Sequence, residues 1–136
     1  MRIALVVEYD GFNYHGFQYQ KNVVTIQEEI EKAIKQFTKE TRRVKAAGRT
    51  DAGVHATGQV IVFDTERNYS SWTIANAMNA YLPCDISVIE AHRVDGEFDP
   101  RRHALSRTYV YSVLNSDLRK PLSRKYTSLV KGSLDV

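Results

Sequence analysis

The chain has 136 residues, of which 43% are hydrophobic and 26% charged, which indicates one globular domain and excludes disordered, collagen-like and disulfide-rich chains. The single cysteine, Cys84, cannot form an internal disulfide, and Glu8 and Asp10 interrupt the amino-terminal run "MRIALVVEYDG" too early for a signal or membrane segment. We therefore expect a cytoplasmic protein without a membrane partner.

The net charge of +3 is distributed unevenly along the chain. Residues 1–100 carry 11 Lys and Arg against 14 Asp and Glu, whereas residues 101–136 carry 8 against 2. The basic last quarter also contains Tyr109, Tyr111 and Tyr126. Cations interleaved with aromatic rings suit a nucleic acid, which offers phosphates to neutralise and bases to stack. The other interpretation is a solvated basic face whose aromatic rings point into the core.

Hydrophobic periodicity predicts the elements of the first half in chain order. Segment 2–9, "RIALVVEY", alternates apolar residues on one face, which predicts a strand. Thr25 and Glu28 form a capping-box pair at the start of "TIQEEIEKAIKQF", whose isoleucines recur at helical spacing, so we expect a helix there. Short strands are expected at 42–47, "RRVKAA", and at 59–65, "QVIVFDT".

The second half continues with a helix and two strands. Ser70 or Ser71 can cap a helix through "WTIANAMNAYL", which stops before Pro83 because the residue preceding proline resists the helical conformation. Segments 85–94, "DISVIEAHRV", and 104–115, "ALSRTYVYSVLN", both predict strands. The order β-α-β-β-α-β indicates an α+β, ferredoxin-like domain, an antiparallel sheet with two helices on one face, plus an additional C-terminal strand region.

The loop between the two expected central strands, "AGRTDAGVHATGQ", contains more reactive groups than a turn requires. Residues i and i+2 of an extended or tightly turned loop project to the same side, so Arg49 can reach the carboxylate of Asp51 and favour its ionised form. An ionised, oriented carboxylate in a cleft is a nucleophile or a base. The alternative is a structural ion pair that pins the turn. His55 suits packing between loop and strand better than acid-base chemistry.

Other classes of site lack their sequence signatures. The four histidines and Cys84 show no paired metal-ligand spacing, no GxxxxGK[ST] phosphate loop is present, and "GRTDAG" lies between strands rather than before a helix. The loop "YDGFNYHGFQYQ" combines five aromatic rings with neutral amides, which suits either nucleotide contacts or a hydrophobic wrap that seals the end of the sheet. Any catalysis would therefore depend on a carboxylate and its neighbours.

Six motifs, in order from Ile3 to about Asn115, resemble those of the tRNA pseudouridine synthase A family. They are "YDGFNYHGFQYQ", "TIQEEIEKAI", "AGRTDAGVHATGQV", "LPCDISV", "FDPRRHA" and "SRTYVYSVLN". The resemblance implies an isomerase that converts uridine to pseudouridine in the anticodon stem-loop of tRNA, at family positions 38 to 40, with no cofactor and no metal.

The resemblance also implies roles for single residues. Asp51 matches the nucleophile that attacks the target uridine, and Arg49 matches the arginine that pairs with this aspartate and helps to displace the target base. Tyr109, the first tyrosine of "RTYVY", matches the tyrosine that packs on the flipped base. The basic last quarter then becomes a track for the tRNA backbone, with five candidate phosphate contacts: Arg101, Arg102, Arg107, Arg119 and Lys120.

Two features set the chain apart from the family pattern. In "FDPRRHA" the family often has a histidine where Asp99 stands and an aromatic residue where Arg102 stands. Family members also continue into a second, similar subdomain that completes the cleft and the homodimer, so we expect residues 1–136 to form a single catalytic N-terminal subdomain. Because that second half is absent, the alternative function is a non-catalytic, ferredoxin-like RNA-binding module.

Overall fold

A computed structural model describes all 136 residues, which divide into two compact units, Met1–Ala104 and Leu105–Val136. The first unit contains a 3-10 turn, Gly11–Asn13, besides its strands and helices. In chain order these are β1 (Arg2–Tyr9), α1 (Ile26–Thr38), β2 (Lys45–Ala46), β3 (Ala56–Asp64), α2 (Ser71–Tyr81) and β4 (Ile86–Val94). The expected β-α-β-β-α-β order is confirmed.

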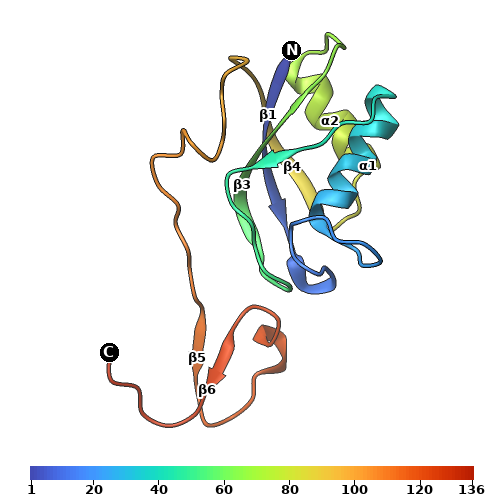
Figure 1. Ribbon diagram of the computed structural model, residues 1–136. Coiled ribbons are helices and arrows are strands. Elements are labelled where there is room, and N and C mark those ends of the chain that lie inside the picture. The colour runs from blue at the N-terminus through green and yellow to red at the C-terminus, as the bar shows by residue number, and fades with distance from the viewer. The chain divides into compact units, whose positions relative to one another are not determined.

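The four strands of the first unit form one antiparallel sheet in the order β2-β3-β1-β4. Leu5 in the central strand β1 lies opposite Ile61 of β3 on one side and Ala91 of β4 on the other. Both helices cover the same face of the sheet (Figure 1). This arrangement confirms the ferredoxin-like fold class.

Both helices begin at the caps that the sequence provides. The Thr25 hydroxyl accepts a hydrogen bond from the Glu28 amide at 3.3 Å, and the Ser70 hydroxyl accepts one from the Thr73 amide at 3.1 Å. Each cap satisfies an amide that has no partner within its helix. Helix α2 ends at Tyr81, two residues before Pro83, as expected. With 13 and 11 residues, the two helices are too short to cross a bilayer.

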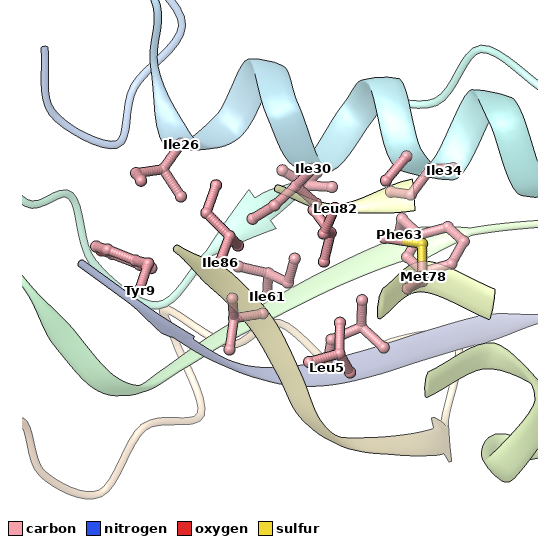
Figure 2. Close-up of a cluster of buried hydrophobic side chains, with 14 of the residues drawn as sticks. Leu5, Tyr9, Ile26, Ile30, Ile34, Ile61, Phe63, Met78, Leu82 and Ile86 are labelled. Atoms are coloured by element: carbon pink, nitrogen blue, oxygen red, sulfur yellow. The ribbon is translucent and has the colours of Figure 1, made fainter. Parts of the chain in front are cut away.

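The core lies between the helices and the sheet. Alternate residues of β1 point into it, and isoleucines four residues apart on α1 point down to meet them (Figure 2). Each such side chain contributes about 1.5–3 kcal/mol relative to exposure in water. The principal core side chains are Ile3, Leu5, Val7, Ile26, Ile30, Ile34, Ile61, Phe63, Ile74, Met78 and Ile86.

The strand expected at 42–47 is mostly wrong, because only Lys45 and Ala46 pair with β3. The amide of Val44 donates instead to the Glu31 carboxylate of α1 at 3.1 Å. The same carboxylate group accepts a hydrogen bond from Arg43 at 2.8 Å. The Glu31 side chain of α1 thus takes the place of a strand partner, and β2 is shortened to two residues.

The second unit contains a parallel pair of short strands, β5 (Val113–Asn115) and β6 (Ser128–Val130), with a 3-10 turn at Pro121–Ser123 between them. The strand expected at 104–115 is therefore wrong for most of its length. Residues 105–111 pair with no strand, and their apolar side chains are exposed. An alternating pattern forms a strand only where a neighbour takes up its backbone hydrogen bonds.

Candidate active site

Two loops of the first unit are joined by main-chain hydrogen bonds at one end of the sheet. The Phe17 amide of the β1–α1 loop donates to the Thr50 carbonyl of the β2–β3 loop at 3.0 Å. In the opposite direction, the Gly53 amide donates to the Tyr14 carbonyl at 3.3 Å. These bonds fix the backbone on both sides of Asp51.

Two glycines allow the β1–α1 and β2–β3 loops to approach this closely. A Cβ atom on Gly11 would lie 2.0 Å from the carbonyl oxygen of Val54, which is far inside contact distance. Gly16 has a φ of +83°, which disfavours other residues, and its Cβ would lie 2.9 Å from the Thr50 carbonyl oxygen. A side chain at either position would push the two loops apart.

The residues that precede Asp51 are held by two buried side chains. The Gln59 amide group binds both main-chain polar atoms of Gly48, accepting from its N–H at 3.3 Å and donating to its carbonyl at 2.9 Å. The Tyr9 hydroxyl shares a hydrogen bond of 2.7 Å with the Thr50 hydroxyl. Burial raises the pKa of Tyr9 against the opposing effect of its hydrogen bonds to Thr50 and Gln59, so its phenol remains protonated at neutral pH.

A third loop, between α2 and β4, joins the same end of the sheet through Asp85. Its carboxylate accepts a hydrogen bond of 2.6 Å from the Tyr14 hydroxyl, and its carbonyl accepts one of 2.9 Å from the Asp10 amide. Burial, together with the hydrogen bond to Asp85, raises the pKa of Tyr14 well above its usual value. The Tyr14 hydroxyl therefore acts as a permanent donor that anchors the β1–α1 loop.

Asp51 is exposed on this fixed backbone, and so is Arg49. The Asp51 carbonyl accepts a hydrogen bond from the Val54 amide at 3.1 Å, which closes the turn and leaves the carboxylate outside it. The expected ion pair is not formed, because no hydrogen bond or ion pair joins Arg49 to Asp51. Both charged groups therefore face solvent from neighbouring positions of one rigid loop.

His55 connects the end of the β2–β3 loop to the first turn of the β1–α1 loop. Its Nδ1 accepts a hydrogen bond from the Gly11 amide at 3.0 Å and lies 3.1 Å from a carboxylate oxygen of Asp10. This half-buried position agrees with the packing role expected from the sequence. Tyr9 and Gln59 were not predicted as site residues. A polar Gln59 at the start of the apolar run "QVIVFDT" could have indicated a buried amide that binds the neighbouring loop.

Two of the five candidate phosphate contacts extend from a tight turn after β4. A carboxylate oxygen of Asp99 accepts hydrogen bonds from the Arg101 amide at 2.9 Å and the Arg102 amide at 3.1 Å. These two amides, with the nearby charges of Lys45 and Arg102, hold the pKa of Asp99 below its usual value. The Asp99 amide donates to Nδ1 of His103 at 3.1 Å. The unexpected aspartate therefore builds the turn that exposes both arginines.

The other predicted residues, Tyr109, Arg107, Arg119 and Lys120, lie in the second unit, where their side chains are exposed. Their placement beside Asp51 stays a prediction. No group of three His, Cys, Asp or Glu side chains is arranged to hold a metal ion.

Comparison with known proteins gives a consistent result. Residues 5–101 match the family model described as tRNA pseudouridine synthase. The tRNA pseudouridine synthase A of Syntrophomonas wolfei is 46% identical over 125 residues, which cover 92% of this chain and 50% of the relative. That of Colwellia psychrerythraea is 47% identical over 124 residues (90% and 47%), and that of Shewanella sediminis 44% identical over 137 residues (99% and 52%). The chain spans about half the length of the curated relatives it matches.

Proposed function

The chain belongs to the tRNA pseudouridine synthase family, and from this membership we propose that it supplies the catalytic subdomain of an enzyme that isomerises uridine to pseudouridine in tRNA. The observation that carries the proposal is the position of Asp51. Its carboxylate is exposed on a loop whose backbone is fixed by main-chain hydrogen bonds and by the close packing of Gly11 and Gly16.

The reaction exchanges one bond for another within the same nucleotide. The glycosidic bond from the sugar to N1 of uracil breaks, and a bond from the same sugar carbon to C5 forms. C5 loses a proton and N1 gains one, so atoms and electrons balance without a cofactor. The protein must supply a nucleophile, hold the detached base and exclude water.

Asp51 is the proposed nucleophile, and Arg49 and Tyr109 are proposed to handle the base. The guanidinium of Arg49 has no protein partner in the structure, which leaves its donors available to displace the target base and then to orient Asp51. Flipping a nucleotide costs a few kcal/mol, and stacking on an aromatic ring such as that of Tyr109 returns about 1–3 kcal/mol of it.

The substrate and setting follow from the family resemblance. We propose that the target uridines lie in the anticodon stem-loop at family positions 38 to 40, and that the protein is cytoplasmic. Arg101, Arg102, Arg107, Arg119 and Lys120 are the proposed contacts to the RNA backbone. A longer chain, of the length of the curated relatives, is proposed to act as a homodimer.

Turnover can be counted by the release of tritium from tRNA labelled at C5 of uridine, because that hydrogen leaves as the new bond forms. The 136-residue chain is compared with a chain extended to the length of its relatives. Each is tested with Asp51→Asn and with the control Asp135→Asn, which changes another exposed aspartate. We expect Asp51→Asn to abolish release and to leave the affinity for tRNA nearly unchanged.

The same assay separates the enzyme from an RNA-binding module without chemistry. Equal tritium release by Asp51→Asn and the unmodified protein would refute the nucleophile assignment. Binding of tRNA without any release, in both the short and the extended chain, would favour the binding module.

A further inference from the structure

A groove of about 450 Å³ lies beside the β2–β3 loop, entirely within the first unit. Buried side chains, including Phe17 and Val44, form part of its lining. Its charged lining consists of four basic side chains and a single acidic one: Lys45, Arg49, Arg101, Arg102 and Asp99. The groove therefore carries a surplus of positive charge over a partly apolar lining.

Three of these cations lack the acidic partners that four other basic residues of the unit, Arg2, Lys32, Arg42 and Arg43, have. No ion pair involves Lys45, Arg49 or Arg102. By contrast, Arg2 pairs with Asp64 at 2.9 Å, Arg42 with Glu40 at 3.3 Å and Arg43 with Glu31 at 2.8 Å. Like charges gathered around one groove repel each other, and an anion that binds there would relieve the repulsion.

The one acid of the groove offsets only part of their charge, because a single carboxylate faces four cations. A carboxylate oxygen of Asp99 is already occupied by the main-chain amides of Arg101 and Arg102. Asp99 thus fixes the turn that carries Arg102, while Lys45 reaches the groove from the short edge strand β2. The two cations come from different elements, which suits a ligand with successive negative charges better than a single small anion.

We propose that this groove binds the phosphodiester backbone of RNA next to the target nucleotide, with Lys45 and Arg102 as its principal phosphate-binding side chains. The inference rests on the proposed function, because Arg49 both lines the groove and lies two residues before Asp51. Lys45 is not among the phosphate contacts expected from the sequence, and Arg102 replaces a residue that is often aromatic in the family.

The salt dependence of RNA binding tests the proposal, because each phosphate contact contributes a defined amount to the slope of log Kd against log salt concentration. The probe is a fluorescently labelled anticodon stem-loop RNA, titrated with the 136-residue chain over a series of salt concentrations. The variants are Lys45→Gln, Arg102→Gln and the double substitution. Arg67→Gln is the matched control, since Arg67 is exposed, has no ion pair and lies outside the groove.

We expect Lys45→Gln and Arg102→Gln each to lower the magnitude of the slope by about 1, and the double substitution by about 2. Both should weaken binding to stem-loops of different sequence alike, whereas Arg67→Gln should leave the slope unchanged. Equal slopes for the groove variants and Arg67→Gln would overturn the proposal. So would the absence of salt-dependent binding by the unmodified chain, or displacement of the RNA by inorganic phosphate at constant ionic strength, which would indicate a site for a free anion.

Failure of the groove and failure of the proposed function give different results. Asp51→Asn should retain the full salt slope and lose tritium release. A reduced slope in the groove variants without any turnover by the unmodified protein would support the groove and refute the enzyme. Normal turnover by the unmodified protein, with unaltered slopes in the groove variants, would support the enzyme and refute the groove. Thermal unfolding of each variant provides the structural control, because Lys45 and Arg102 are both exposed.

Discussion

The first unit buries its apolar side chains between two layers, whereas the second leaves most of its own in water. Ile3 and Leu5 of β1 are fully buried, while Leu105 is fully exposed and Tyr109 is 79% exposed. The same alternation of apolar residues occurs in both segments. Alternation therefore specifies only which residues share a face, and a neighbouring strand and a covering helix are needed before that face contributes to stability.

Truncation of one side chain in each unit gives the largest expected contrast. Ile61→Ala removes a fully buried side chain that lies opposite Leu5, and we expect it to lower the free energy of unfolding by about 2–5 kcal/mol. Leu122→Ala changes a side chain that is almost fully exposed, and we expect an effect within about 0.5 kcal/mol. Urea denaturation measures both. Comparable losses would show that the second unit has a core of its own.

For turnover we expect the opposite contrast. The exposed Tyr109 of the second unit should affect the reaction rate and leave the stability unchanged. Tyr109→Phe keeps the ring that is proposed to stack on the base, whereas Tyr109→Ala should lose about 1–3 kcal/mol of that stacking. We expect turnover close to normal for the first variant and reduced about 5- to 150-fold for the second, since about 1.4 kcal/mol corresponds to a factor of ten. Neither should alter the unfolding midpoint. Indistinguishable turnover of Tyr109→Phe and Tyr109→Ala would show that the ring does not hold the base.

The smallest expected effect is a dependence of the first unit's stability on acid. Hydrogen bonds from Arg2 hold the pKa of Asp64 below its usual value, which stabilises the folded chain above the unfolded pKa of about 3.9. This stabilisation is lost as the pH falls through the lower, folded pKa. We expect Arg2→Met to make the fall in unfolding free energy shallower in acid. Denaturation measured from pH 6 to pH 2, about two units on either side of the unfolded pKa, tests this. Glu40, whose pKa is also lowered, should preserve part of the fall.

Local signals were sufficient for the elements of the first unit. Thr25 and Ser70 cap their helices with their own side chains, and Leu5 and Ile61 follow the period of their strands. The length of β2 could not be predicted, because it depends on a hydrogen bond between Val44 and Glu31, thirteen residues apart in the chain. Hydrophobic periodicity describes residues within one element, so it does not predict a contact between two elements.

The sequence predicted which residues the Asp51 loop contains, but not the contacts that hold the loop in place. The positions of Arg49 and Asp51 on a strand-to-strand loop followed from the sequence, but their ion pair did not form. The roles of Tyr9 and Gln59 required the fold, because each side chain reaches the loop from a strand. The role of Tyr109 could be proposed only by resemblance, since its own segment 105–111 pairs with no strand.

The close packing of Gly11 and Gly16 against the β2–β3 loop has a consequence for molecular evolution and for engineering. The contact is made by main-chain atoms, so it does not involve the exposed side chains of Asn13 and Gln18. Exposed residues such as Asn13 and Gln18 are therefore free to vary without displacing Asp51. If the proposed function holds, a library randomised at those two positions is a way to retarget the protein to other RNA sequences while the proposed nucleophile, Asp51, stays in place.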